Sequence, residues 1–353
     1  MPVLKNVMQL NDFNFDLPEN FIAQSPAFPR DSSKLFVFDT KNDKIYHKKF
    51  FQIIEFLSKG DVLISNKSKV IKCRLIFSYQ GKQIEIFVIK ELQKNIFNAL
   101  IKPGKLFKLG NILNINDDLK IEVTKILPDG SRNLTFICDH DFDFEKYGSI
   151  PLPPYIEDNA KYYESYQTVY ADQTKSGSLA APTAGLHFSE KLLSQLKTMQ
   201  IPFENVVLHV GRGTFEPVKT ENIFDHKMHS ELYEIDENTA NNLNTYKAQE
   251  KRLIAIGTTT VRTLESNFTK FKKFQSEMSE TEIFILPGIY KWKTVEGLIT
   301  NFHLPKSTLL MLVASFLEHK GVKDPVKRLL ELYEIAKIEN YRFYSFGDAM
   351  FIF

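Results

Sequence analysis

Cysteine is scarce in this sequence, and the spacing patterns of metal sites are missing from it. Its 353 residues include only two cysteines, Cys73 and Cys138, which supply neither a disulfide framework nor a metal-ligand spacing. We predict that both are small, buried and chemically inert side chains. The H-E-x-x-H and C-x-x-C motifs are absent, so no metal is expected.

Long apolar runs are missing as well. The longest, around LLMLVASFL (309–317), has roughly half of the ~20 residues that a membrane-spanning helix needs. The first residues, MPVLKNVMQLNDF, lack the basic and then apolar design of a secretion signal. We therefore expect a cytoplasmic protein with no membrane partner. The sequence leaves the oligomeric state open, and a monomer is the simplest expectation.

Neither sign of charge is in strong excess. The chain has 45 Lys and Arg against 43 Asp and Glu, a formal net charge of +2, so nucleic-acid binding would need a local basic patch. The G-x-G-x-x-G and G-x-S-x-G motifs are also absent. Their absence disfavours a nicotinamide-binding Rossmann site and an α/β-hydrolase.

The pattern that is present begins as α/β structure, in a chain long enough for about two domains. KLFVFD (34–39) and DVLISN (61–66) have the apolar runs of buried strands. Between them FFQIIEFLSKG (50–60) predicts a short helix that Gly60 ends. Strand, helix and strand in succession are typical of an α/β domain.

From about Val70 to Asp139 the pattern changes to short strands separated by turns. LKIEVTKI alternates apolar and polar residues with a period of two, as a half-buried strand does. No convincing helix interrupts the series, so we predict a small antiparallel β-barrel. The expected strands are IKCRLIFS (71–78), KQIEIFVI (82–89), IFNALI (96–101), NILNI (111–115), LKIEVTKI (119–126) and NLTFIC (133–138).

After the proline-rich connector GSIPLPPYIED (148–158), which cannot extend a helix or a strand, the α/β pattern returns. We therefore predict a mixed-sheet α/β domain built from two chain segments, 1–70 and 151–353, with a β-barrel domain inserted at 71–150. The elements expected in the second segment are a helix at 189–199, a strand at 204–211, a helical stretch around 236–250, a strand at 252–257 and a helix at 260–267.

Five stretches place Gly, Thr, His or Arg at a turn after an apolar or small-residue run. In an α/β sheet, ligands bind at the carboxyl ends of strands, beside helix N-termini, so these turns could converge on one cleft. Ser189 and Ser307 are predicted helix N-caps within them. The stretches are LAAPTAGLHFSEK (179–191), VVLHVGRGTFEPV (206–218), LIAIGTTTVRTLES (253–266), GLITNFHLPKSTLLML (297–312) and YRFYSFGDAMFIF (341–353).

Each motif also has a purely structural explanation. His187 alone fits a hydrogen-bonded core histidine, and Gly257 with its threonines fits a helix cap. Tyr166 and Tyr170, with Tyr162 and Tyr163, fit a packing face as well as a base-stacking surface. HKMHSE (226–231) holds two histidines and a glutamate but no third metal ligand, which favours acid–base use.

Taken together, in this order and spacing, these stretches resemble the S-adenosylmethionine:tRNA ribosyltransferase-isomerases, a family of queuosine biosynthesis. The match runs nearly from end to end of the chain. Further stretches that carry it are FDLPENFIAQSPAFPRDSSKLFVFD (15–39), PLPPYI (151–156), YQTVYA (166–171), AAPTAGLHF (180–188), IGTTTVRTLES (256–266) and YRFYSFGDAMFI (341–352).

The resemblance implies a fold, a reaction and two substrates. The family has an α/β domain with an inserted β-barrel. It transfers the ribosyl part of S-adenosylmethionine to 7-aminomethyl-7-deazaguanine at the wobble position of a tRNA, and the sugar rearranges to give epoxyqueuosine while adenine and methionine leave. S-adenosylmethionine would thus be a co-substrate, and the anticodon stem-loop of tRNA the partner.

We expect the groups that move protons in such a reaction to be histidines or carboxylates with pKa values near the working pH. The candidate catalytic residues are His187, His209, His229, Glu231, His303 and Asp348. We expect substrate contacts from Thr183, Gly185, Tyr166, Tyr170, Gly211, Gly213, Gly257, Thr258, Thr259 and Arg262.

The chain departs from the family pattern at two places. The family usually has Asn-Asp-Thr-Arg-Val where this chain has Asn66-Lys67-Ser68-Lys69-Val70, so an ammonium replaces a carboxylate. Arg212 stands where the family more often has a small or apolar residue. Lys67 keeps a second hypothesis open, a non-catalytic tRNA-binding homologue, and the use of S-adenosylmethionine keeps a third, an RNA methyltransferase.

Overall fold

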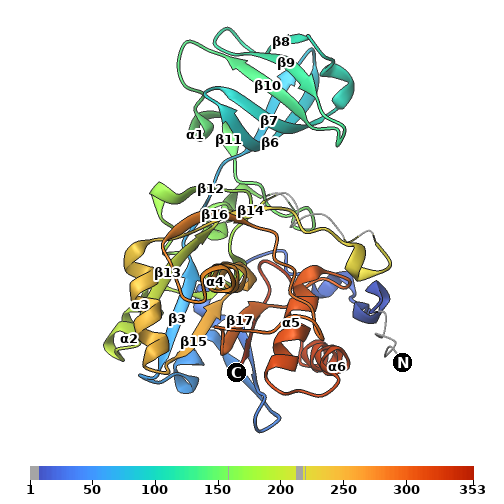
Figure 1. Cartoon of the computed structure of the whole chain (residues 1–353). Helices are drawn as coiled ribbons and strands as arrows, with labels where there is room; N and C mark the ends of the chain where they lie inside the picture. Colours follow the sequence, from blue (N-terminus) through green and yellow to red (C-terminus); the bar gives the residue numbers. More distant parts are fainter. Residues whose placement is uncertain (1–7, 158, 212–217, 219) are drawn as a thin grey trace, which may run out of the picture. The chain divides into compact units, whose positions relative to one another are not determined.

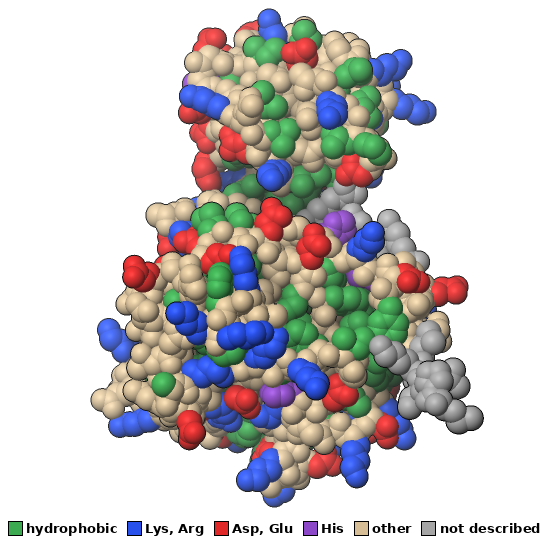
Figure 2. Space-filling model, viewed as in Figure 1, with side chains coloured by type: hydrophobic (Ala, Val, Ile, Leu, Met, Phe, Trp, Pro, Cys, Tyr) green, Lys and Arg blue, Asp and Glu red, His purple; other side chains and the backbone are tan. Residues whose placement is uncertain are grey.

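The computed structural model (Figure 1) describes residues 8–157, 159–211, 218 and 220–353. Within that part of the chain, no helix combines the length and the apolar character of a membrane span. Figure 2 shows basic and acidic side chains interspersed over the visible surface of each unit, as the small net charge predicts. The chain forms two compact units. Met1–Lys69, Pro153–Ser176 and Ala181–Phe353 form the first, and Val70–Leu152 and Gly177–Ala180 form the second.

The first unit is built on a mixed sheet of nine strands, to which both the N-terminal and the C-terminal segments contribute. The predicted mixed-sheet α/β fold is therefore confirmed. In sheet order the strands are β16 (Glu277–Thr281), β14 (Glu231–Ile235), β13 (Phe203–Leu208), β3 (Asp61–Asn66), β15 (Arg252–Ile256), β17 (Gly297–Asn301), β18 (Ala349–Ile352), β1 (Lys34–Asp39) and β2 (Lys44–Lys49).

The strand directions bring many strand ends to one edge of this sheet. β13, β3, β15 and β17 are parallel, whereas β14 and β18 run against them and β1 runs parallel to β18. The carboxyl ends of four strands therefore meet the amino ends of three others. We call this the carboxyl edge; it comprises the residues just after Leu208, Asn66, Ile256 and Asn301 and those around Glu231, Ala349 and Lys34.

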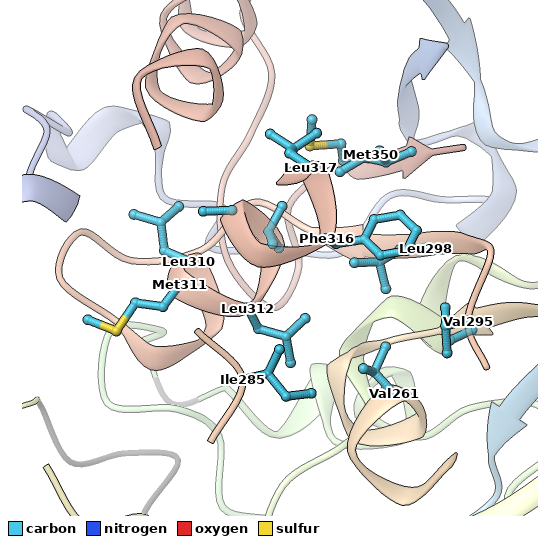
Figure 3. Packing of buried hydrophobic residues seen from close by; sticks show 14 of the residues in the cluster. Val261, Ile285, Val295, Leu298, Leu310, Met311, Leu312, Phe316, Leu317 and Met350 are labelled. Atoms are coloured by element: carbon cyan, nitrogen blue, oxygen red, sulfur yellow. The ribbon is translucent and has the colours of Figure 1, made fainter. Parts of the chain in front are cut away.

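Side chains that alternate along the strands feed two cores, one on each face of the sheet. In β1, Phe36 and Phe38 join one core and Leu35 and Val37 the other, as the two-residue period of a strand requires. Figure 3 shows part of the first core, in which Phe316 lies beside Leu298 and Leu317 beside Met350. Central strands such as β3 are buried along their whole length, which explains the apolar run 62–64 within it.

Helices cover both faces. The predicted caps are confirmed: Ser189 Oγ accepts from the amide of Leu192, and Ser307 Oγ from that of Leu310. The helices that pack on the first core are α3 (Glu237–Ala248), α4 (Thr258–Phe271), α5 (Thr308–His319) and α6 (Pro325–Ile338); those on the second are α2 (Glu190–Thr198) and the 3-10 helices η4 (Phe50–Phe56) and η9 (Thr183–His187).

Two local expectations were wrong. The predicted helix at 50–60 is a 3-10 helix that ends at Phe56, so Gly60 lies in the turn before β3 rather than ending the helix. Cys138 is half-buried, with its Sγ 3.0 Å from the carbonyl oxygen of His140, because it follows the last strand residue. Cys73 is buried as expected, and burial raises the pKa of its thiol to about 12.

The second unit is an antiparallel sheet of seven strands that curves into a half-barrel. The six predicted strands are confirmed, and a short strand after the helix α1 (Phe144–Tyr147) joins them. In sheet order the strands are β11 (Gly148–Ser149), β5 (Arg74–Tyr79), β6 (Lys82–Gln93), β7 (Ile96–Lys102), β10 (Arg132–Ile137), β9 (Lys120–Ile126) and β8 (Ile112–Asn114). The remaining two strands, β4 (Lys69–Val70) and β12 (Ser176–Ser178), contain points where the chain passes between the units.

Candidate functional site

The predicted stretches reach the carboxyl edge of the nine-stranded sheet from several sides. His209 follows β13, Gly257 follows β15 and His303 follows β17. Glu231 begins β14, and Asp348 directly precedes β18. Segments far apart in the sequence are therefore neighbours here, as expected for loops at the ends of parallel strands.

His187 is held at this edge with both ring nitrogens engaged. Its Nδ1 lies 2.8 Å from Ser33 Oγ, its Nε2 lies 3.3 Å from Asn301 Nδ2, and its ring stacks on Phe50. An amide nitrogen only donates, so Nε2 accepts and the proton sits on Nδ1. Burial lowers the pKa of His187 to about 4. The imidazole is therefore neutral near pH 7, and its contacts suit an orienting group better than a proton carrier.

Asn301 is the residue at this site that the sequence analysis missed. Its Nδ2 also donates to the carbonyl oxygen of Tyr344 at 3.1 Å, and its Oδ1 accepts from Thr183 Oγ1 at 3.2 Å. One buried amide thus connects η9, β17 and the loop before β18. Its place as the last residue of β17, two residues before His303, is the signal that could have revealed it.

Asp348 has a structural set of contacts. Its carboxylate accepts from the amides of Lys34 and Arg342, at 2.9 and 2.8 Å, and pairs with the Arg342 guanidinium at 3.2 Å. Only 2% of its surface is exposed. These contacts fix the start of β1 against the last loop, so the carboxylate is not available as the predicted catalytic acid or base.

His303 faces away from the His187 network. Its Nε2 lies 2.8 Å from Thr300 Oγ1, and its amide donates to Tyr333 at 3.1 Å. Thr300 and Asn301 are consecutive in β17 and point to opposite faces of the sheet. Burial alone lowers the pKa of His303 to about 3. The structure therefore separates two histidines that the sequence placed in one group.

A different constellation lies on the β14 side of the edge. Arg262, on α4, forms a buried ion pair through Nη1 with Glu231 Oε2. The other oxygen of Glu231 accepts from the amide of Gly211 at 3.0 Å. Arg262 is 6% exposed and Glu231 5%. Nε and Nη2 of Arg262 have no hydrogen-bond partner among the described residues.

The start of α4 adjoins η9. Gly257 has a φ of +85° and donates its amide to Ile299 O at 2.7 Å. A Cβ at this glycine would lie 3.6 Å from that of Ala184, so the two predicted turns are in contact. Thr258 is buried, and the hydroxyl of Thr259 is buried without a partner among the described residues.

Buried polar atoms without partners gather around the ends of β13, β3 and β15. Such atoms are rare in folded proteins because each costs desolvation free energy. His209 contributes Nδ1, and burial lowers the pKa of this histidine. The hydroxyls of Ser68 and Thr168, which the sequence analysis did not single out, belong to the same group. This concentration marks the part of the edge that suits a polar ligand.

The predicted aromatic surface is closed in this structure. Tyr166 is 1% exposed and packs edge-on against Phe346, so its ring offers no face to a base. A Cβ at Gly185 would lie 2.0 Å from the Tyr170 hydroxyl. The glycine therefore makes room for Tyr170 and not for a ligand. His229 is exposed, and the predicted contact residue Gly213, like Arg212, lies outside the described residues.

The carboxyl edge is too long for all the predicted catalytic residues to serve one reacting atom. Five strand spacings separate β14, which Glu231 begins, from β18, which Asp348 precedes. At ~4.8 Å per spacing, the two carboxylates are about 24 Å apart. The structure therefore groups Glu231, Arg262 and His209 on one side and Asp348, His187 and Asn301 on the other.

Lys67 follows β3 and is paired with an acid. Its Nζ lies 3.3 Å from Asp172 Oδ2, and its carbonyl oxygen accepts from the Asp172 amide at 2.9 Å. Hydrogen bonds from the hydroxyl and the amide of Thr174, and to a smaller extent Lys67, lower the pKa of Asp172 to about 2. The ammonium of Lys67 therefore has a carboxylate of this chain beside it.

Comparison with known proteins finds similar chains over nearly the whole length of this one. The family model for "Queuosine biosynthesis protein" matches residues 10–352. A protein of Fusobacterium nucleatum, named S-adenosylmethionine:tRNA ribosyltransferase-isomerase, is 45% identical over 350 residues, which are 98% of this chain and 97% of that protein. A protein of the same name from Desulfitobacterium hafniense is also 45% identical, over 98% of this chain and all of its own.

A solved structure is similar as well. The crystal structure of S-adenosylmethionine tRNA ribosyltransferase from Thermotoga maritima has 35% sequence identity and a TM-score of 0.55. The alignment covers 97% of this chain and 100% of that one. The similarity thus extends over both units of the molecule.

Proposed function

Because the chain belongs to the family of queuosine biosynthesis proteins, we infer that it is an S-adenosylmethionine:tRNA ribosyltransferase-isomerase. The observation that carries this conclusion is the 45% identity to the Fusobacterium nucleatum protein of that name over 98% of the chain. The reaction transfers and isomerises the ribosyl group of S-adenosylmethionine onto 7-aminomethyl-7-deazaguanine at the tRNA wobble position. Epoxyqueuosine in tRNA, adenine and methionine are the products.

The substrates are S-adenosylmethionine and the anticodon stem-loop of a tRNA, and the enzyme acts in the cytoplasm. The α/β segments 1–70 and 151–353 form the catalytic domain, and 71–150 form the inserted domain. This assignment is supported by the position of the candidate residues, since those at the carboxyl edge belong to the α/β segments. The expectation that no metal takes part stays a prediction.

The reaction needs a base beside the sulfonium, because the sulfonium acidifies the adjacent 5′-carbon, and an acid for the departing adenine. His209 is the best supported of the four candidate histidines. Its buried Nδ1 has no partner among the described residues, and burial lowers its pKa, so the neutral ring can accept a proton near pH 7. His187 and His303 use ring nitrogens in structural contacts.

The contacts of η9 support a second role, the orientation of a substrate. The Thr183 hydroxyl donates a hydrogen bond to Asn301 Oδ1, and Asn301 Nδ2 in turn donates to the carbonyl oxygen of Tyr344. The lone pairs of Thr183 then remain for a ligand, and the neutral His187 holds the amide of Asn301 in one orientation. Such indirect fixation of contacting groups is how active sites keep their geometry.

The decisive experiment is incubation of the protein with S-adenosylmethionine and a tRNA that carries the aminomethyl base, followed by mass analysis of the nucleosides. We expect epoxyqueuosine and one adenine released per modified tRNA. The same tRNA without the aminomethyl group is the control. Methyl-labelled S-adenosylmethionine separates the alternatives: label in RNA would indicate a methyltransferase, and tRNA binding without adenine release a non-catalytic homologue.

A further inference from the structure

Arg262 is a buried cation, and three of its five N–H donors, those on Nε and Nη2, have no partner among the described residues. Glu231 takes only Nη1, while Nε and Nη2 have no partner among the described residues although Arg262 is 6% exposed. A guanidinium withdrawn from water loses its hydration on every nitrogen. Leaving these N–H groups unpaired is therefore unfavourable unless a ligand accepts hydrogen bonds from them.

Nε and Nη2 of Arg262 have a geometry that suits the binding of an oxyanion. Nε and Nη2 lie on the same side of the planar guanidinium, and their N–H groups point in parallel. This fork matches the two oxygens of a carboxylate, or two oxygens of a phosphate. Glu231, which the Gly211 amide holds at 3.0 Å, fixes the plane of the guanidinium from its other side.

A second buried group without a partner lies on the same helix. Thr259 lies three residues before Arg262 on α4, on the same side of the helix, and its hydroxyl is buried without a partner among the described residues. Thr259 is the second residue of a helix of 14 residues. The N-terminus of such a helix carries partial positive charge and unpaired amides, which attract anions. Arginine fork, hydroxyl and helix end thus favour the same kind of ligand.

We propose that the Nε–Nη2 edge of Arg262, together with Thr259, binds a substrate oxyanion, the carboxylate of the methionyl end of S-adenosylmethionine, and that Glu231 is the residue that positions Arg262. This proposal rests on the proposed function. The enclosed position favours the terminal group of a small substrate over a phosphate inside a polynucleotide chain. A tRNA phosphate has the same chemistry, and the experiment separates the two sources.

The test compares substrates with and without the carboxylate. Arg262→Lys keeps the charge but removes the fork. We expect this variant to raise the KM for S-adenosylmethionine by at least about tenfold, the effect of losing one charge-assisted hydrogen bond, and to leave the KM for tRNA unchanged. Decarboxylated S-adenosylmethionine, measured by calorimetric binding, should bind the wild type and the variant equally weakly.

Arg252→Lys is the matched control. Arg252 also pairs with a buried carboxylate, Asp61, but lies at the opposite edge of the sheet, so its replacement should leave both KM values unchanged. A rise in the KM for tRNA alone would identify a phosphate as the oxyanion. Unchanged KM values and unchanged S-adenosylmethionine binding in a folded Arg262→Lys protein would overturn the proposal. Calorimetric binding without ribosyl transfer by the wild type would instead refute the proposed function.

Discussion

Glu231 could either transfer protons itself or only position Arg262, and kinetic measurements distinguish these two roles. Both of its oxygens are engaged, one by Arg262 and one by the Gly211 amide. The substitutions Arg262→Lys and Glu231→Gln would each disturb the same proposed oxyanion-binding site. A residue that acts only through Arg262 should therefore show no additional effect once Arg262 is changed.

We expect Glu231→Gln to raise the KM for S-adenosylmethionine several-fold with little change in kcat. The double variant Glu231→Gln/Arg262→Lys should be no worse than Arg262→Lys alone, within about 0.5 kcal/mol. Steady-state kinetics on the four proteins measures this coupling. Additive losses in kcat, with one limb of the pH profile missing in Glu231→Gln, would show that Glu231 transfers protons itself.

His209 is expected to act as the base in its neutral form. Because burial lowers its pKa, the rate of adenine release should fall only as the pH drops below the usual histidine value of about 6.5. His209→Asn should lower the single-turnover rate by about 10²–10⁴-fold and abolish this limb of the profile. His319→Asn, a histidine beside Glu296 at the opposite edge, should retain the wild-type rate and profile.

At the scale of elements, the helix α4 carries both a candidate substrate-binding residue and a residue that stabilises the fold. The helix α4, in which the sequence predicts substrate contacts from Thr258, Thr259 and Arg262, carries Arg262 at the carboxyl edge and Glu265 in the core. Glu265 is 0% exposed and accepts from Tyr290 Oη, from Thr294 Oγ1 and from the amides of the same loop. These bonds hold residues 290–295 against α4, and they involve no candidate substrate group.

We therefore expect Glu265→Ala to act on stability and not on substrate binding. Removing a buried carboxylate from several donors should lower the free energy of unfolding by about 3–5 kcal/mol. Denaturant unfolding checks this, with the exposed Glu282→Ala as a control that should stay within about 0.5 kcal/mol of the wild type. An unchanged stability together with a raised KM for either substrate would instead place Glu265 in the site.

The sequence predicted those strands whose own residues show a recognisable pattern of apolar side chains. β1, β3 and β15 are continuous apolar runs because both of their faces are buried, and the half-barrel strands alternate. β2 and β16, at the two ends of the sheet order, are mostly polar, so no periodicity marked them. Edge strands have one open side and often carry charge for that reason.

The candidate site was predictable in its location and much less so in its contacts. Turn residues after apolar strands indicate a strand end, and strand ends share an edge, so the sequence could place His209 and Gly257 at this edge, with Arg262 on the helix that follows Gly257. The hydrogen bond from His187 to Ser33 joins residues 154 positions apart. A local pattern contains no information about such a partner, and the same holds for the Asn301 amide.

At the scale of the whole molecule, the division into two units follows from a change of pattern that the sequence displays directly. What it does not display is which strands are neighbours. β3 pairs with β13 and with β15, and these strands come far later in the chain. Any of the apolar runs could occupy the centre of the sheet. A buried strand needs apolar side chains, but this need does not specify which strand is its neighbour. Strand pairing therefore had to come from the structure.

The stability of the whole molecule should depend on pH through its buried histidines. The folded-state pKa values of His187 and His303 are about 4 and about 3, whereas the unfolded value is about 6.5. Below pH ~6.5 these two histidines take up protons in the unfolded chain but stay neutral in the folded chain. Their stabilising effect is complete above that pH and is lost as the pH falls toward the folded-state values.

Each of the two histidines contributes a slope of up to ~1.4 kcal/mol per pH unit. Denaturant unfolding at about pH 6 and pH 5 should therefore show a loss of up to about 3 kcal/mol in the wild type. In His303→Gln the loss should be smaller by roughly half, because one of these two histidines, His187, still resists protonation in the folded state. Equal slopes in the two proteins would mean that His303 is protonated in the folded state, and its burial beside Thr300 and Tyr333 would then not control its charge.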